Sequence, residues 1–459
     1  MSVRPIFTKP TLVTEWIDDD QEERDTYWTS LFYDLILVAG VGAISDPFNE
    51  LMEEGEKNHP ENLQSGLLVP ISPLILNAII QFSLLFIQWL YFNEYTSTFE
   101  DESLVGHIAS FVYLLGLAMS VTGCVGELEE AYTMLAYGII VSKIGLISMY
   151  IGPYLYIEKA RSHLTLRCVV ALALLCITAI SIYLDISFHW FRKIFIVLCI
   201  LDILSFPMII FLKDRLRIHI ANFTDRYKDL TLIIFGEAIF SITIQEAAPS
   251  RKIIENFGGQ ALTLWLIYSL ALNEFNLYPK PDEHALRRSI IFAILWNVTM
   301  QVKTIFLLGT SVGIKRAHFL IWESEGNIDI GTKNLLIYGI SFTLFSVVFI
   351  RSYSFGWGRH PNVHDPPRIK ALKYFWWFGL GSVSISPLFV EKFMLLQNYE
   401  SITSLLVVKC LGILLALLTL LEAIISNLAA AMLGVKLESG GNYLGVESPP
   451  SQYNSITVT

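Results

Sequence analysis

The sequence contains little charge and no clustered cysteines. Only 16% of its 459 residues are charged, whereas about a quarter is usual in a soluble domain, and the mean hydropathy is +0.53. The five cysteines are scattered, mostly within apolar runs and without metal-ligand spacing, so we interpret them as packing residues. No basic patch interleaved with aromatic residues occurs, which argues against a nucleic-acid partner. The composition predicts an integral membrane protein whose main partner is the lipid bilayer.

The sequence also lacks two short motifs of common enzyme classes. It has no His-Glu-x-x-His and no phosphate-binding loop. Its histidines are dispersed, and the loop from His360 to Asp365 is more typical of a turn than of a metal site, because no second cluster of ligands accompanies it. We therefore expect no enzyme activity, no cofactor and no bound metal.

Both ends of the chain are polar, and the region between them is a series of apolar runs. Residues 1–27 lack the basic segment that opens a signal peptide, so we expect an uncleaved cytoplasmic tail. Residues 440–459 are rich in Gly, Ser and Pro, as disordered tails are. Each run between them is long enough to cross a bilayer. We predict an all-α, polytopic bundle of about 12 spanning helices: 28–46, 70–93, 104–123, 130–152, 164–184, 190–212, 229–247, 258–277, 288–311, 333–351, 373–392 and 403–431.

The placement of Lys and Arg orients this bundle. With the N-terminus in the cytoplasm, the cytoplasmic segments carry roughly twice as many Lys and Arg residues as the opposite side, in agreement with the positive-inside rule. Because twelve is an even number, both termini are then cytoplasmic. Plasma and organelle membranes both fit this orientation.

Parts of the sequence recur at similar spacing. The matched parts are Arg24 to Asp34 with Arg226 to Glu237, Trp89-Leu90-Tyr91 with Trp265-Leu266-Ile267-Tyr268, and His107 with His284. They are consistent with two six-helix halves of the same orientation, 28–212 and 229–431, and the sites of such proteins tend to lie between the repeats. The alternative is that aromatic-rich membrane helices simply look alike.

Five ionisable residues lie well inside apolar helices: Asp34, Lys143, Asp202, Glu237 and Lys303. A charged side chain at the centre of a bilayer costs about 2.5–3.5 kcal/mol on insertion scales, so such residues face the bundle interior and pair with one another. Lys143 is about ten residues from either end of its helix, too deep to reach the interface. We expect a charge network in the membrane interior. A static set of buried ion pairs is the alternative.

Other polar residues mark helix faces that must point into the bundle, because lipid cannot satisfy them. They are Asn77, Gln81 and Gln88 on one helix, Asn297 and Gln301 on another, and Ser241 one turn after Glu237. They line a path or simply hold helices together. Glu274, in contrast, is expected to be wet because it lies close to the end of its helix.

A charged cluster leads into the seventh predicted helix as Asp225-Arg226, followed by Thr231 and Gly236-Glu237. This stretch resembles the low-temperature-requirement A (LtrA) family of membrane proteins, whose pattern is roughly Glu-Arg-x-x-x-x-Thr-Ile-Ile-x-x-Gly-Glu. The opening Leu31-Phe32-Tyr33-Asp34-Leu35, preceded by Arg24, is similar to the first helix of that family. The resemblance covers residues 23 to about 310. It implies a fold and names no reaction or substrate.

Three function classes fit these features. The first is a proton- or cation-coupled secondary transporter, with Asp34 and Glu237 at the interface of the halves and Lys143 or Lys303 as counter-charge. The second is a cation channel, and the third is a membrane- or lipid-associated factor that transports nothing. We favour the transporter, with a small ion or small molecule as its substrate.

Overall fold

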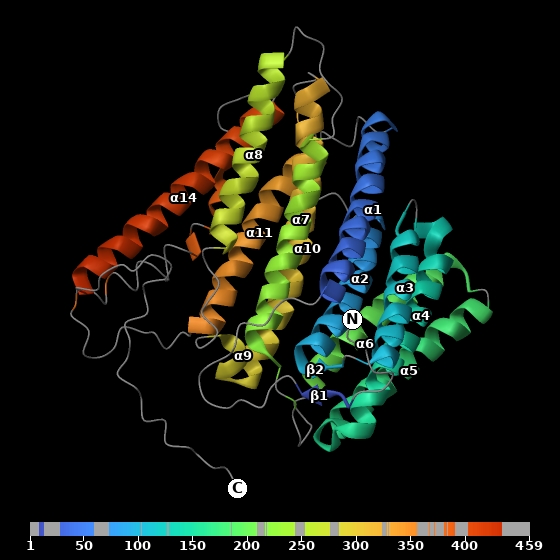
Figure 1. The fold of residues 1–459 in the computed structure, drawn as a ribbon. Helices are drawn as coiled ribbons and strands as arrows, with labels where there is room; N and C mark the ends of the chain where they lie inside the picture. The colour runs from blue at the N-terminus through green and yellow to red at the C-terminus, as the bar shows by residue number, and fades with distance from the viewer. Residues whose placement is uncertain are drawn as a thin grey trace, which may run out of the picture.

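The structure, a computed structural model, is a bundle of long α-helices (Figure 1). It describes residues 9–12, 28–58, 73–101, 103–125, 128–184, 186–208, 218–243, 253–275, 284–323, 330–355, 384–390 and 403–433, with a few isolated positions besides. The first six helices are α1 (Trp28–Asn58), α2 (Pro73–Thr98), α3 (Leu104–Thr122), α4 (Leu128–Tyr156), α5 (Arg161–Tyr183) and α6 (Phe188–Met208). The later helices are α7 (Ile220–Thr243), α8 (Ile253–Phe275), the short α9 (Ala285–Arg288), α10 (Ile290–Glu323), α11 (Ile330–Phe355) and α14 (Ser404–Leu433).

The predicted all-α class is confirmed, and the helix ends are where the prediction was inaccurate. Eleven of the predicted ranges coincide with a described helix, and the range 373–392 lies largely outside the described residues. The described strands are two-residue pieces, β1 (Thr11–Leu12) and β2 (Phe99–Glu100). Several helices continue into charged sequence: α7 begins at Ile220 and not at 229, and α10 ends at Glu323 and not at 311.

Eight of the described helices are apolar and long enough to cross a membrane. The spans are Thr29–Asp46, Ile75–Thr98, Leu104–Thr122, Ala131–Tyr156, Glu158–Tyr183, Ile291–Ile321, Gly331–Ser354 and Ser404–Leu421. Helices α6 and α7 are long enough but carry more charge, Arg192, Lys193 and Asp202 in α6 and the cluster from Asp225 to Asp229 in α7. The predicted count of 12 spans therefore stays a prediction.

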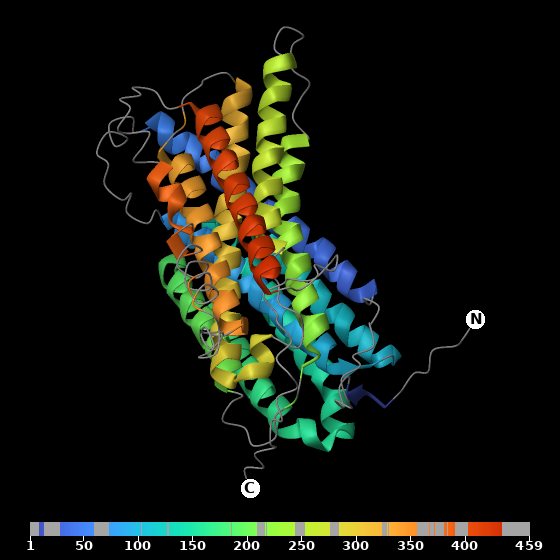
Figure 2. The same ribbon diagram turned by 90° about the vertical axis from the view of Figure 1, so that its left-hand side faces the viewer.

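The two parts of the chain occupy different sides of the bundle. In Figure 1, α1 to α6 (blue to green) lie on one side and α8, α11 and α14 on the other. The seam is formed by α1 and α2 from the first part with α7 and α10 from the second, which contact one another directly. Figure 2 shows the long helices running side by side along the length of the molecule.

The N-terminal strand β1 lies at one end of the bundle, together with the ends of three helices and the segments that follow or precede them. Strand β1 pairs antiparallel with β2, which directly follows α2. The His219 amide, just before α7, donates to the Ser97 carbonyl oxygen at 3.1 Å. Pro10 lies beside Gly152 in the last turns of α4. The N-terminal segment, the α2–α3 connection, the end of α4 and the start of α7 are therefore at the same end, as an up-and-down bundle requires.

The distribution of side chains on α1 is that of a helix in lipid. Leu31 and Phe32 are about half exposed and Leu35 is 66% exposed, while Tyr33 and Leu37 are fully buried. The exposed face is therefore apolar, which water would disfavour and hydrocarbon would not.

Helices α3 and α4 form an unusually close antiparallel pair. A Cβ atom on Gly116 would lie 2.6 Å from the Cα atom of Ser142, and one on Gly145 would lie 2.6 Å from the Cα atom of Tyr113. Only a hydrogen fits at these two positions, so backbone meets backbone, as at small-residue contacts between membrane helices.

The tryptophans that were matched in the predicted repeat lie in different surroundings. Trp89 is completely buried, whereas Trp265 is 47% exposed and Tyr268 is 60% exposed. The match in sequence therefore does not extend to the environment of these side chains.

Candidate functional site

The first buried ion pair joins α1 to α7 across the seam. The Arg226 guanidinium donates to both carboxylate oxygens of Asp34, with a distance of 2.7 Å from Nη2 to Oδ1, and also contacts the Ser30 carbonyl oxygen at 3.3 Å. Arg226 is 1% exposed and Asp34 is 8% exposed. A paired, two-point contact of this kind fixes the orientation of both groups. The counter-charge of Asp34 is therefore Arg226 and not Lys143 or Lys303.

Aromatic rings pack against one another across the seam, next in sequence to Arg226. Trp89 of α2 meets the Tyr227 ring edge-on at 4.9 Å, and Tyr227 meets Trp296 of α10 at 5.1 Å. The Tyr227 hydroxyl donates to Asn297 at 2.6 Å. Asn297, predicted as a polar lining residue, thus holds α7 and α10 together.

A second ionic group lies further along the same helices. The Lys315 ammonium on α10 contacts Glu237 of α7 at 3.1 Å and also Asp46 of α1, and it approaches the Ser45 hydroxyl at 3.5 Å. Glu237 is buried. Its carboxylate lies against Gly42 of α1, where the absence of a side chain leaves room for it. The counter-charge of Glu237 is Lys315, which the predicted helix ending at 311 left in a loop.

An apolar layer separates these two levels. Asp34 and Gly42 are eight residues apart on α1, about 12 Å at 1.5 Å per residue. Between the levels, Leu37 and Val41 of α1 and Leu230 and Ile234 of α7 are all buried in one continuous core cluster. Charge is therefore concentrated at both faces of a dry layer at the seam.

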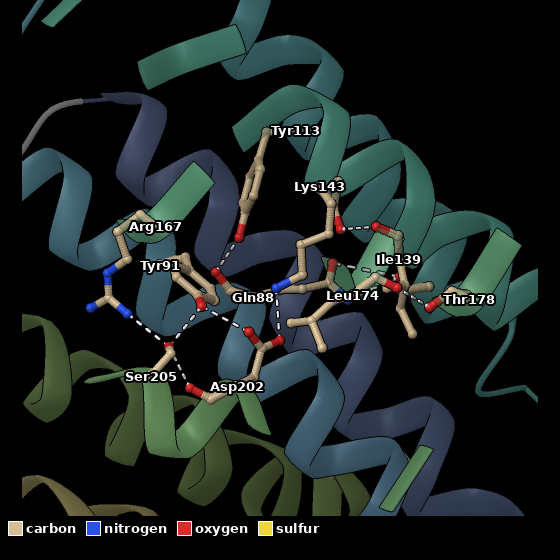
Figure 3. Close-up of polar contacts among 12 residues, drawn as sticks. Gln88, Tyr91, Tyr113, Ile139, Lys143, Arg167, Leu174, Thr178, Asp202 and Ser205 are labelled. Carbon is tan, nitrogen blue, oxygen red and sulfur yellow. Dashed lines mark hydrogen bonds and ion pairs between the residues drawn. The ribbon is translucent and has the colours of Figure 1, made fainter. Parts of the chain in front are cut away.

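A third cluster lies inside the first part of the chain (Figure 3). The Lys143 ammonium on α4 contacts Asp202 of α6 at 2.7 Å. The Tyr91 hydroxyl of α2 donates to the other oxygen of Asp202 at 2.7 Å and lies 3.1 Å from the Ser205 hydroxyl. Arg167 of α5 donates to Ser205 at 2.9 Å. The expectation that Lys143 is paired holds, with Asp202 as its partner.

The same cluster continues to two residues near the start of α5. Arg167 donates to Glu94 of α2 at 2.7 Å, and His163 contacts the same carboxylate oxygen at 3.3 Å. All three side chains are buried. The sequence did not predict this triad, because Glu94 follows the predicted end of its helix at 93 and Arg167 lies only three residues inside the predicted range 164–184.

A fourth buried pair lies in the second part of the chain, where Lys303 of α10 contacts Glu274 of α8. The expectation that Glu274 is wet was wrong, since this side chain is 3% exposed. The five ionisable residues of the predicted network are therefore distributed over four separate ionic groups, and one continuous network does not connect them in the described residues.

The remaining residues of the predicted site do not share one type of contact. Gln88 donates to Ser120 of α3 at 3.1 Å, and Ser241 donates to the carbonyl oxygen of its own helix at Ala238. Gln81 and Gln301 are buried, and Asn77 is partly buried. In the family-like motif, Asp225 is exposed and paired with Lys228, Gly236 is exposed, and Arg24 lies outside the described residues. Among the residues that the structure describes, no three His, Cys, Asp or Glu side chains come together as a metal site.

These observations define the class of protein. A multi-pass helical bundle with an apolar exterior and paired charges inside is an integral membrane protein. A family model described as bacterial low temperature requirement A protein (LtrA) matches residues 26–436, so the chain belongs to the LtrA family. Neither a curated protein nor a solved structure matches it.

Proposed function

We propose that the protein is a proton- or cation-coupled secondary transporter whose coupling carboxylates are Asp34 and Glu237. The observation that supports this most is the seam, where acids of α1 and α7 pair with bases of α7 and α10 at two levels. Any movement of α1 against α7 and α10 must break or exchange these pairs. Because a carboxylate that loses its base in a dry interior takes up a proton or a cation instead, helix movement and ion binding are coupled.

The packing of each part supports two six-helix halves that move against each other. If α1 corresponds to α7, then the pair of α3 and α4 corresponds to the pair of α10 and α11. The pair of α2 and α6 then corresponds to the pair of α8 and α14. The two helices of each pair are in direct contact. A Cβ atom on Gly313 of α10 would lie 3.2 Å from the backbone nitrogen of Leu336 of α11, so this second hairpin is also closely packed. The seam is then the interface of the halves, where repeat-built transporters bind their substrates.

A flux assay tests the proposal. In proteoliposomes with an imposed proton or alkali-cation gradient, Glu237→Gln and Asp34→Asn should each lower saturable flux by roughly ten- to a hundredfold, since a charge-assisted hydrogen bond is worth about 1.5–3 kcal/mol and an amide cannot titrate. The matched control is Asp225→Asn, which removes an exposed carboxylate of α7 and should leave flux unchanged.

Other outcomes point to other classes. Currents too fast for alternating access, with selectivity altered in Glu237→Gln, would indicate a cation channel. If both variants fold and move ions as the wild type does, or if the wild type moves none under any gradient, the transport proposal is refuted and a non-transport role in the membrane takes its place.

We also propose that the end of the bundle that carries β1 and β2 faces the cytoplasm. The positive-inside count supports this orientation. In a cysteine-free background, Glu158→Cys at that end should react with a membrane-impermeant maleimide only from the cytoplasmic side. The control is Val125→Cys, which is exposed at the α3–α4 turn and should react only from the opposite side. Reversed labelling of the two variants would overturn the orientation.

A further inference from the structure

Glu94 forms an ion pair with Arg167, and its contact with His163 is additional to that pair. His163 Nε2 lies 3.3 Å from Glu94 Oε1, and Arg167 Nη2 lies 2.7 Å from the same oxygen. An imidazole nitrogen that faces an ionised carboxylate carries the hydrogen of the contact. The other ring nitrogen, Nδ1, therefore presents a lone pair that can accept a proton.

Several buried polar atoms of this triad, and of two tyrosines beside it, have no hydrogen-bond partner among the residues that the structure describes. His163 Nδ1 has none, and neither have the second carboxylate oxygen of Glu94, the Nε of Arg167 or the hydroxyls of Tyr95 and Tyr150. Side-chain polar atoms that are buried in proteins are nearly always paired with protein or with ordered water. So many unpaired atoms in this triad and beside it indicate a hydrated site, because water bridges polar groups of this kind.

The site is close to one end of the bundle. His163 is the third residue of α5, and Glu158 and Lys159 of the preceding 3₁₀ turn (Glu158–Ala160) are exposed, as is Arg161. Water at this end is therefore about one helical turn away. On its inner side the triad continues through Arg167, Ser205 and Tyr91 to the Asp202–Lys143 pair (Figure 3).

We propose that His163 Nδ1 is a proton-binding site, filled from the water at this end of the bundle, with Glu94 as its orienting counter-ion. The proton comes from hydronium and leaves water behind, no other bond breaks, and the triad changes from net zero charge to +1. Arg167 transmits this change electrostatically to Ser205, since a guanidinium keeps its own proton. The use of this site for proton coupling rests on the transport function proposed above, whereas proton binding itself does not.

The charged and titratable groups beside His163 come from several elements. Glu94 of α2 contacts the imidazole, and Arg167 of α5 donates to the same carboxylate oxygen. Tyr150 of α4 lies near Glu94 and Arg167 and packs against Tyr95 of α2. Asp101, after β2, lies beside Gly152 of α4, and Glu158 and Arg161 precede His163 in the chain. Glu94 is the carboxylate in contact with the imidazole, so it dominates the stability of the protonated form.

Solid-state nitrogen NMR of the full chain in lipid vesicles tests this assignment. Ser162-His163 is the only Ser-His pair in the sequence, so Ser labelled at its carbonyl carbon selects the backbone nitrogen of His163, and His labelled at every carbon and nitrogen carries that selection to its ring without any substitution. At neutral pH we expect a protonated Nε2 and an unprotonated Nδ1, and on acidification both nitrogens should be protonated. The opposite tautomer, or an imidazole that does not titrate between pH 8 and pH 5, would overturn the proposal.

A pair of variants separates this role from a packing role. Glu94→Gln retains an acceptor for Nε2 but loses the charge, so the tautomer should be kept while the ratio of protonated to neutral His163 at a given pH falls by roughly tenfold. Glu158→Gln removes an exposed carboxylate at the same end and should change neither. An unchanged ratio in folded Glu94→Gln would refute the role of Glu94 as counter-ion. Because no gradient or transported substrate is needed, these results are independent of the flux assay.

Discussion

Replacing Arg226 by Met should destabilise the protein by about 3–5 kcal/mol, because it leaves the Asp34 carboxylate buried without its base. The side chain of Met is close in length and apolar, so the packing loss is small beside the electrostatic one. The double variant Asp34→Leu with Arg226→Met should recover most of the loss, since a buried pair replaced by apolar groups is often tolerated. Unfolding in mixed micelles, followed by circular dichroism, measures all three proteins.

The matched control lies two residues further on. Lys228 pairs with Asp225 at 2.7 Å, but the two side chains are 37% and 62% exposed. Lys228→Met should therefore cost no more than about 1 kcal/mol. Equal losses in Arg226→Met and Lys228→Met would show that the α1–α7 pair does not hold the seam together.

Replacing Gly116 by Val should separate α3 from α4 and cost about 3 kcal/mol or more, at the upper end of the effect of overpacking. The new Cβ would meet the backbone of Ser142, which cannot move aside as a flexible side chain could. The fraction of protein that stays monodisperse after a heat step is a simple measurement of this effect.

Gly258 provides the comparison, because a Cβ atom there meets nothing within 4 Å. Gly258→Val should leave stability unchanged or raise it slightly, since Val exceeds Gly in helix propensity by a few tenths of a kcal/mol. If Gly116→Val is as stable as Gly258→Val, the close approach of α3 and α4 is not a feature of the folded protein.

The direction of the buried polar side chains could be predicted from the sequence. Asp34, Gln88 and Glu237 occupy helix faces whose opposite sides are apolar, and a lipid environment leaves only the interior for them. The pairing of Lys143 also followed from its depth. Periodicity and depth are local properties, so a single sequence contains them.

The partners of these residues could not be predicted, and the reason is physical. Hydropathy ends a helix at the first charged residue, yet Glu94, Arg226 and Lys315 all lie in helical turns beyond or before the predicted limits. These charges are tolerated inside because each neutralises another, and that depends on contacts between distant helices. One pattern in the sequence could have extended these helices. Gln88, Tyr91 and Glu94 continue at helical spacing past the predicted end at 93.

The apolar layer between the Asp34 and Glu237 levels has an electrical consequence. Where water and mobile ions are excluded over about 12 Å, the potential difference between the two sides of a membrane is concentrated into a short distance. A unit charge that crosses the full field exchanges about 2.3 kcal/mol per 100 mV. In the transporter proposed above, Leu37, Val41, Leu230 and Ile234 would insulate the two sides from each other, and Arg226 and Lys315 would be the charges nearest to that layer.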